Sequence, residues 1–495
     1  MKQLGFAFLA GLASALGFAP LSLWPVTVAA FAVLLWLIET APSLRSALAR
    51  GWWFGLGQFV LGLNWIATAF TYQAAMPAWL GWVAVVLLSL YLAIYPAAAA
   101  GLAWRWGRRN RHALVLILAA AWLVTEWLRA SLFTGFAWNP IGVVLIDSWV
   151  RWAAFVVGTY GLSAILVLLA GACWLLALRQ GWGRFVAIGV LILLVMLDPV
   201  LVRRADRARL AAQPPLRIVQ PNIGQQNKWD PRFERENFRR LVRLTGRSAE
   251  PRLVLWPEAA TPDFLAIELP ARQRIAAALG SRDLLLLGGV ELIFDAGRPV
   301  AAYNSLYLLD PAARLRGRYD KAHLVPYGEY LPMRPLLSAL GLSRLAPGDL
   351  DFRSGPGPRT LTLPGFGRAG VQVCYEIIFS GHVVDRDNRP DFIFNPSNDA
   401  WFGAWGPPQH LAQARLRAVE EGLPVIRATP TGISAVIHAD GSVAQSLPLG
   451  TAGAIDARLP PARAPTPFAR LGNLLALAFA VLLIAGAIAA RRKAR

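Results

Sequence analysis

Three side chains in the polar middle of the chain have the chemistry needed for nucleophilic catalysis. Glu258 follows the apolar run 253–257, Cys374 lies near the end of the run 370–375, and Lys321 lies between them in sequence. Because ligands of α/β sheets gather beyond the carboxyl ends of the strands, we expect the three groups to converge. A thiol needs a base to become a thiolate, and Glu258 would be that base. Lys321 and main-chain N–H groups would stabilise the oxyanion of a tetrahedral intermediate.

Each of these residues also has a simpler interpretation. A carboxylate at a strand end often only marks where the chain reaches water, and a lone cysteine is usually a small buried residue. Against this, Cys374 is the only cysteine in the polar region, and Lys321 is one of four lysines in the chain. An unpaired thiol in an oxidising compartment is a liability unless it is used. His323 is an alternative base, although its closeness to Lys321 and the turn at Pro326 favour a structural role.

The elements that would position these residues alternate between strand and helix patterns. Strands are predicted at 216–223, 253–257, 284–290, 305–309, 370–375, 392–395 and 433–438, and helices at 231–247, 270–279 and 409–421. Strands of this kind have buried-looking apolar runs, and the helices lie between them. The alternation predicts an α/β layered domain over residues 203–466.

The chain as a whole is unusually apolar: hydrophobic residues make up 56% of the sequence, and the mean hydropathy is +0.45. The apolar residues are concentrated before and after the polar middle region. A bilayer-crossing helix needs about 20 mostly apolar residues. Candidate spans lie at 4–19, 26–40, 53–72, 79–100, 113–128, 152–178, 185–202 and 471–490. We therefore predict a membrane domain of seven helices at 1–202 and an eighth transmembrane helix with a basic tail at 467–495.

The net charge of +20 reflects membrane orientation rather than nucleic-acid binding. No dense basic patch interleaved with aromatic residues occurs, and many arginines lie in short loops between apolar runs. Basic residues follow the second, fourth, sixth and last spans, whereas the loops after the first and third carry no charge. The positive-inside rule then places both termini in the cytoplasm and residues 203–470 outside. A cleaved signal peptide ending near Ala15 is the alternative for the first span, and it leaves the middle domain on the same side.

Four short motifs resemble those of the nitrilase (carbon–nitrogen hydrolase) superfamily. They are Trp256-Pro257-Glu258, Tyr319-Asp320-Lys321, the segment from His323 to Glu329, and Cys374-Tyr375-Glu376. Together with the apolar spans on both sides, the whole chain resembles the membrane-embedded branch of that superfamily, the bacterial apolipoprotein N-acyltransferases. Further similarities lie at Asn222, 228–230, 397–403 and 134–138.

This resemblance implies a fold, a reaction and a set of roles. The fold would be an αββα sandwich outside the cytoplasm, on a multi-pass membrane base in the bacterial inner membrane. An acyl chain would pass from a phospholipid to Cys374 as a thioester, and then to the α-amine of the diacylglyceryl-cysteine of an apolipoprotein. Glu258 would be the general base, Lys321 the oxyanion stabiliser and Cys374 the nucleophile. Glu329 would orient Lys321, and Tyr375 and Glu376 would support the pocket. We expect a monomer without metal, other cofactor or nucleic acid.

Three aromatic residues and one apolar segment are candidates for lipid contact. Trp229, Trp401 and Phe402 are substrate-binding candidates, with ordinary packing as the alternative. The segment 331–346, which contains Arg334 and Arg344, is too short to span a bilayer. It is typical of an interfacial or lid element, and a core helix is the alternative.

Two other functions use the same features. A membrane-tethered amidase would transfer the acyl group to water, and the three candidate catalytic residues alone do not exclude it. A transporter would place ionisable residues within its spans, where Glu39 and Glu126 are the main acidic candidates. Both lie close to predicted span ends, which disfavours transport.

Overall fold

The computed structural model describes residues 2–72, 77–178, 185, 188–189, 213–339 and 350–493. The chain divides into two compact units. One comprises Met1–Ala67, Gly81–Val202 and Pro465–Arg495, and the other comprises Thr68–Leu80 and Arg203–Ala464. The short piece Thr68–Leu80 therefore belongs with the unit that contains the strands, although its sequence lies within the apolar half.

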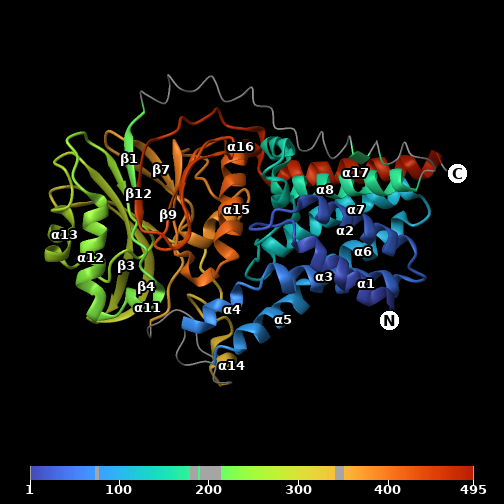
Figure 1. The fold of residues 1–495 in the computed structure, drawn as a ribbon, viewed down its shortest axis with the longest axis horizontal. Coiled ribbons are helices and arrows are strands. Elements are labelled where there is room, and N and C mark those ends of the chain that lie inside the picture. Colours follow the sequence, from blue (N-terminus) through green and yellow to red (C-terminus); the bar gives the residue numbers. More distant parts are fainter. Residues whose placement is uncertain are drawn as a thin grey trace. The chain divides into compact units, whose positions relative to one another are not determined.

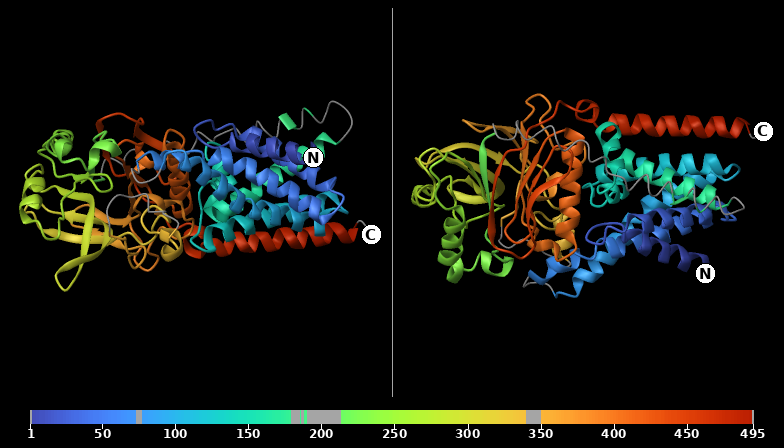
Figure 2. Two further views of the ribbon diagram at one scale, coloured as in Figure 1. Left: turned by 90° about the horizontal axis from the view of Figure 1, so that it is seen from below. Right: turned by 45° about the horizontal axis from the view of Figure 1, so that its top comes forward.

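The first unit is helical (Figure 1). The α-helices among its described residues are α1 (Lys2–Ala15), α2 (Trp24–Glu39), α3 (Leu44–Gly62), α4 (Ile66–Ala69), α5 (Leu80–Leu92), α6 (Ile94–Gly107), α7 (Arg111–Ser131), α8 (Ala154–Ala177), α16 (Pro467–Leu471) and α17 (Asn473–Lys493). The side chain of Asn110 caps α7 by accepting from the Ala113 N–H. Although α17 is distant in sequence, it runs beside α7 and α8 (Figure 2). The last helix is thus part of the same bundle as the amino-terminal ones.

Two of the predicted spans are interrupted in the structure. The predicted span 79–100 instead lies within one apolar helical segment, Leu80–Gly107, in which only Ala93 separates α5 from α6. Within α8, Gly158 has φ of +65°, and a Cβ there would lie 2.1 Å from the ring of Phe468. The predicted span 53–72 stops at Gly62 and resumes at Ile66.

Four helical segments in the described residues are long and apolar enough to cross a membrane. They are Leu80–Gly107, Arg111–Ser131, Trp149–Ala177 and Asn473–Lys493, and the bent pair Leu44–Gly62 and Ile66–Tyr72 would add a fifth. Helices α1 and α2 have only 14 and 16 residues, fewer than the roughly 20 that a crossing needs. The predicted span 185–202 lies almost entirely outside the described residues.

The second unit contains two six-stranded sheets. The first has the order β12 (Gly453–Arg458), β1 (Pro215–Gln220), β2 (Leu253–Leu255), β3 (Leu284–Asp295), β4 (Arg298–Leu309) and β5 (Leu315–Asp320). The second has the order β11 (Val443–Leu447), β10 (Ser434–Ile437), β9 (Val425–Ala428), β8 (Phe392–Pro396), β7 (Gly367–Val371) and β6 (Thr360–Leu363). Strands β1, β2 and β3 are parallel to one another, as are β7, β8 and β9.

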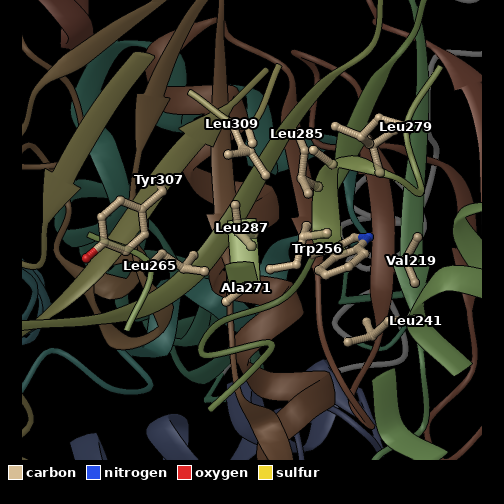
Figure 3. Packing of buried hydrophobic residues seen from close by; sticks show 14 of the residues in the cluster. Val219, Leu241, Trp256, Leu265, Ala271, Leu279, Leu285, Leu287, Tyr307 and Leu309 are labelled. Atoms are coloured by element: carbon tan, nitrogen blue, oxygen red, sulfur yellow. The ribbon is translucent and has the colours of Figure 1, made fainter. Parts of the chain in front are cut away.

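The sheets form the two inner layers of this unit, with helices outside (Figure 1). Helices α12 (Pro231–Thr245) and α13 (Leu269–Ala276) cover the first sheet, and α15 (Gly406–Glu421) covers the second. Apolar side chains, including Leu241, Trp256, Ala271 and Leu287, fill the space between the first sheet and its helices (Figure 3). Trp256 is fully buried, and its indole N–H donates to Thr245 Oγ1 at 2.9 Å. This contact anchors the end of β2, directly before Glu258.

The sequence patterns located the central strands of the two sheets better than the edge strands. All seven predicted strands and all three predicted helices of this unit have counterparts, with ends that differ by several residues. One difference matters for the site, because β7 ends at Val371 and the 3-10 helix η5 (Cys374–Ile378) begins at Cys374. Cys374 and Tyr375 therefore lie in a turn, and the prediction of a strand over 370–375 was wrong there.

Candidate active site

Glu258 is held at the carboxyl end of β2 by its neighbours on β3. Gly288 donates its N–H to the Pro257 carbonyl at 3.2 Å, and its carbonyl accepts from Ala260 N–H at 3.0 Å. A Cβ on Gly288 would lie 2.7 Å from Cα of Glu258, so only glycine permits this approach. The carboxylate is 7% exposed, and Oε1 accepts from Asn304 Nδ2 at 2.7 Å. Within the described residues, the buried Oε2 of Glu258 has no hydrogen-bond partner, which leaves it able to accept a proton.

Lys321 immediately follows β5 and is almost completely buried. Its Nζ lies 2.9 Å from Glu329 Oε2 and 3.8 Å from Glu258 Oε1. Its main-chain N–H donates to the Asn304 carbonyl at 2.9 Å. Burial lowers the pKa of Lys321, but the two carboxylates outweigh it and raise the pKa above its usual value. The side chain is therefore a fixed cation.

Cys374 begins η5 with a left-handed backbone, φ +52°, and is 4% exposed. A non-glycine residue in this region costs about 1–3 kcal/mol, and such residues cluster at active sites. The turn from a strand into a helix presents the side chain in the manner of a nucleophile elbow. Burial, and then the charge of Glu258, raise the pKa of the thiol, whereas Lys321 lowers it. The thiol is thus protonated at neutral pH and depends on a base.

Glu376 joins the segment after β5 to the turn that contains Cys374. Its Oε1 accepts from the N–H groups of Ala322 and His323 at 2.7 and 3.0 Å, and its Oε2 accepts from Val373 N–H at 2.6 Å. The hydroxyl of Tyr319 donates to both oxygens, at 2.9 and 3.0 Å. Burial raises the pKa of Glu376 to about 7, against the three N–H donors and the charge of Lys321, which favour the charged form. This carboxylate therefore fixes the spacing between the Lys321 and Cys374 segments.

Two aromatic rings surround His323, the alternative base. The imidazole centroid lies 3.8 Å from that of Phe379 at 32° and 5.9 Å from that of Tyr375. Tyr375 is buried and packs edge-on against Phe379 at 5.3 Å. These contacts agree with the structural interpretation of His323 and with a supporting role for Tyr375.

The three aromatic candidates for substrate contact differ in exposure. Trp229 is 38% exposed, and Nζ of Lys228 lies 5.3 Å from its ring centroid. Phe402 is 6% exposed and packs edge-on against His410 at 5.5 Å, which agrees with the packing alternative. Trp401 is half-buried and packs edge-on against Tyr72 at 5.6 Å. In the predicted lid 331–346, α14 (Arg334–Ala339) is helical, and residues 340–349 lie outside the described residues.

Two polar residues at the site were assigned no role from the sequence. Asn304 on β4 donates to Glu258 Oε1 and to Glu329 Oε1, at 2.7 and 2.8 Å. Lys228 ends α11 (Gln225–Lys228), and its buried ammonium donates to the Glu258 carbonyl at 3.1 Å. Burial lowers the pKa of Lys228 to about 8, although Glu258 and Cys374 oppose the shift. The asparagine lies within an apolar strand, so only the fold reveals its position.

The structure therefore brings Glu258, Lys321 and Cys374 to one buried site, with Glu329, Glu376 and Tyr375 around them. A carboxylate with one unused oxygen, a fixed ammonium and a protonated thiol can form a thioester with a carbonyl substrate. Lys228 and Glu258 also line one cavity, with Asn237, Phe238 and Thr261.

The unit that holds the two sheets matches a known protein family over most of its length. Residues 216–465 match the family described as Carbon-nitrogen hydrolase. A CN-hydrolase superfamily protein from Xanthomonas campestris aligns with a TM-score of 0.34 and 18% identity, over 50% of this chain and 90% of that protein. An amidase of the nitrilase superfamily from Nesterenkonia aligns with a TM-score of 0.33 and 17% identity, over 52% and 93%. By its family match, the second unit is a carbon–nitrogen hydrolase domain.

The helical unit identifies a more specific family within the carbon–nitrogen hydrolases. Residues 10–172 match the family described as Apolipoprotein N-acyltransferase N-terminal domain. Apolipoprotein N-acyltransferases from Rhodopseudomonas palustris and Bradyrhizobium diazoefficiens are 36% and 38% identical, over 98% and 97% of this chain and 94% of each relative. A third, from Caulobacter vibrioides, is 37% identical over 98% of this chain and 94% of its own length. The chain belongs to the apolipoprotein N-acyltransferase family.

Proposed function

We propose that this protein transfers an acyl chain from a phospholipid to the N-terminal α-amine of diacylglyceryl-cysteine apolipoproteins. The observation that carries this proposal is the burial of Glu258, Lys321 and Cys374 at one site in a chain of this family. The reaction has two halves, because the acyl group rests on Cys374 as a thioester between the donor and the acceptor.

In the first half, the Oε2 of Glu258 takes the thiol proton and the sulfur attacks the ester carbonyl of the phospholipid. Lys321, held by Glu329, stabilises the negative charge that develops on the carbonyl oxygen. Collapse of the intermediate breaks the ester bond, and Glu258 returns its proton to the departing alkoxide of the lysophospholipid. The thioester remains, and Glu258 is again a carboxylate.

In the second half, the neutral α-amine of the apolipoprotein attacks the same carbonyl. Glu258 accepts a proton from the attacking nitrogen, Lys321 again stabilises the oxyanion, and the carbon–sulfur bond breaks. The thiolate recovers the proton held by Glu258. An amide forms, and the thiol is restored for the next cycle.

Membrane topology is a further part of the proposal. We propose eight spans, with the membrane domain at 1–202, the catalytic domain at 203–466 outside the cytoplasm of a bacterial inner membrane, and the last span at 467–495. The alternation of basic and uncharged loops supports cytoplasmic termini. The protein would act as a monomer. Membrane-impermeant labelling of single cysteines placed at 250 and 493 in intact spheroplasts tests the orientation, with labelling expected at 250 alone.

Mass spectrometry of the purified protein after exposure to phospholipid vesicles tests the chemistry. We expect an acyl adduct on Cys374 that hydroxylamine removes, and loss of that thioester in Cys374→Ser. Cys173→Ser is the control, because Cys173 is a buried cysteine of the helical unit. Addition of a diacylglyceryl lipopeptide should then give acylated peptide. Release of free fatty acid alone would indicate the amidase reaction instead and would overturn the proposal.

A further inference from the structure

A buried polar cluster lies behind Cys374. It consists of Asp399 at the start of the 3-10 helix η6 (Asp399–Phe402), His410 on α15, and Arg427 on β9. All three side chains are buried, with at most 1% exposed. Nη2 of Arg427 contacts both Asp399 oxygens, at 2.5 and 2.6 Å, and lies 3.0 Å from His410 Nδ1. The site chemistry described above does not use this cluster.

The cluster reaches Cys374 directly through His410 and indirectly through Asn395 and Ser397. At the main chain, Nε2 of His410 lies 3.1 Å from the Cys374 carbonyl oxygen, and Asn395 Nδ2 lies 3.3 Å from it. At the side chain, Ser397 lowers the pKa of the thiol, and its hydroxyl donates to Asp399 Oδ1 at 2.8 Å. Asn395 also accepts from Arg427. Cys374 is therefore enclosed by a ring of contacts that closes on the Asp399–Arg427 pair.

The partners of His410 determine where its proton lies. A carbonyl oxygen only accepts, so the nitrogen that faces Cys374, Nε2, must carry hydrogen. Nδ1 faces a guanidinium, which only donates, and the Asp399 carboxylate. Burial, and then the charge of Arg427, lower the pKa of His410 to about 4, so the ring is neutral near pH 7. In a neutral ring with Nε2–H, Nδ1 accepts from Arg427, and Arg427 neutralises the ionised Asp399.

We propose that His410 is a positioning residue, which stabilises the left-handed backbone of Cys374 by donating Nε2–H to the Cys374 carbonyl. The Asp399–Arg427 pair fixes the orientation of the imidazole. This inference rests on the proposed function, in which Cys374 is the nucleophile. Because the cluster has no net charge, it acts on geometry and leaves the electrostatics of the reaction to Glu258, Lys321 and Glu329. A displacement of about 1 Å in a reacting group can slow a reaction 10²-fold.

The choice of variants follows from the same contacts. Asp399 and Arg427 are poor targets, since removal of either leaves a buried unpaired charge. His410→Gln keeps an N–H donor near the position of Nε2, whereas His410→Met keeps the bulk and removes the donor. His112→Met is the matched control, because His112 is exposed on the helical unit. The readout is the rate of acyl-adduct formation on Cys374 as a function of phospholipid concentration, in purified full-length protein.

We expect His410→Met to lower the maximal acylation rate about 10- to 100-fold with an unchanged half-saturating phospholipid concentration. His410→Gln should restore the rate to within about threefold of the unmodified protein. Equal rates for His410→Met and the unmodified protein would overturn the positioning role, as would equal losses in the Met and Gln variants. Absence of an adduct in the unmodified protein would instead contradict the proposed function.

A second measurement needs no change at His410. The chain has five histidines, and replacing His112, His323, His382 and His438 leaves His410 alone. The ¹⁵N NMR spectrum of such histidine-labelled protein then reports which ring nitrogen of His410 carries hydrogen. We expect a neutral ring with hydrogen on Nε2 at pH 7. A ring with hydrogen on Nδ1 alone, or a cationic ring, would overturn the inference. This test does not depend on the acyl-transfer activity of the protein.

Discussion

Lys321 lies closer to Glu329 than to any other carboxylate that it contacts, with Nζ 2.9 Å from Glu329 Oε2. Glu258 is the more distant partner of the same ammonium, at 3.8 Å. Glu329 also accepts from the Val325 N–H at 2.8 Å, so the loop after Lys321 holds its own counter-ion. Because Glu329 is the nearer partner of Lys321, Glu258 is less tightly paired with this ammonium and better able to exchange a proton.

Replacing Glu329 with glutamine should therefore impair catalysis more than folding. A neutral amide no longer holds the ammonium of Lys321 toward the oxyanion, so we expect thioester formation to slow about 10- to 100-fold. The half-saturating phospholipid concentration should change little. Rapid quench-flow followed by mass spectrometry measures the rate of thioester formation and the half-saturating phospholipid concentration. Asp456→Asn is the control, since it removes the exposed partner of Arg217 and should leave the rate within about twofold. A rate for Glu329→Gln within that same range would contradict the assigned role.

Replacing Glu258 with glutamine should slow acylation by about 10²- to 10⁴-fold at pH 7, because the base is lost. The amide oxygen can still accept from Asn304, so the variant should fold. The deficit should narrow as the pH rises, since burial raises the pKa of the Cys374 thiol and hydroxide then takes the place of the base. Acyl-adduct formation from pH 6 to 10 measures this trend. A deficit that is constant over the whole range would argue against general-base catalysis by Glu258.

The sequence indicated which residues meet at the candidate site better than it indicated their backbone conformation. Glu258 and Cys374 stand out because each follows or ends a strand pattern, and Lys321 stands out because the chain has only four lysines. The pattern from Gly370 to Cys374 predicts a continuous strand. In the structure, β7 ends at Val371, and the positive φ of Cys374 begins a helical turn instead. Periodicity reports which residues are buried and carries no signal for a left-handed residue.

Partners that meet only through sheet register could not be found in the same way. Asn304 joins Glu258 to Glu329 because β4 lies beside β3 and β5, and these pairings are fixed by the whole sheet. Strand β5 itself was not predicted, since its alternating arginines resemble a loop, although such charges are common on edge strands. His410 lay within the predicted helix 409–421 and Arg427 between that helix and the predicted strand 433–438, and no pattern indicated that they meet Asp399.

Replacing Lys228 with methionine should stabilise the protein at neutral pH. The pKa of this lysine is about 8 in the folded chain and 10.5 when exposed, so folding disfavours its charged form. At 1.36 kcal/mol per pKa unit, the penalty below pH 8 is about 3 kcal/mol. Loss of the charged hydrogen bond to the Glu258 carbonyl costs about 2 kcal/mol, which leaves a gain of about 1 kcal/mol.

This gain should depend on pH with a defined sign. The penalty is fully present below pH 8 and disappears as the pH rises to 10.5, where the lysine is neutral in both states. Thermal unfolding midpoints in detergent at pH 7 and 10 should therefore show a benefit from Lys228→Met that shrinks or reverses at the higher pH. Lys493→Met, at the exposed end of α17, is the control. A benefit that grows with pH would show that the buried ammonium is not destabilising.

The contribution of the Glu376 contacts to stability can be separated from their effect on the reaction. Tyr319→Phe removes one of four donors to Glu376, at a cost of about 1 kcal/mol. Tyr307→Phe is closely matched, since that hydroxyl donates to Glu291 at 2.6 Å on the same sheet. Both changes should lower the thermal midpoint similarly, but only Tyr319→Phe should slow acyl-adduct formation, because Glu376 spans the Lys321 and Cys374 segments. Equal acylation rates in the two variants would mean that Glu376 supports the fold without setting the distance between the cation and the nucleophile.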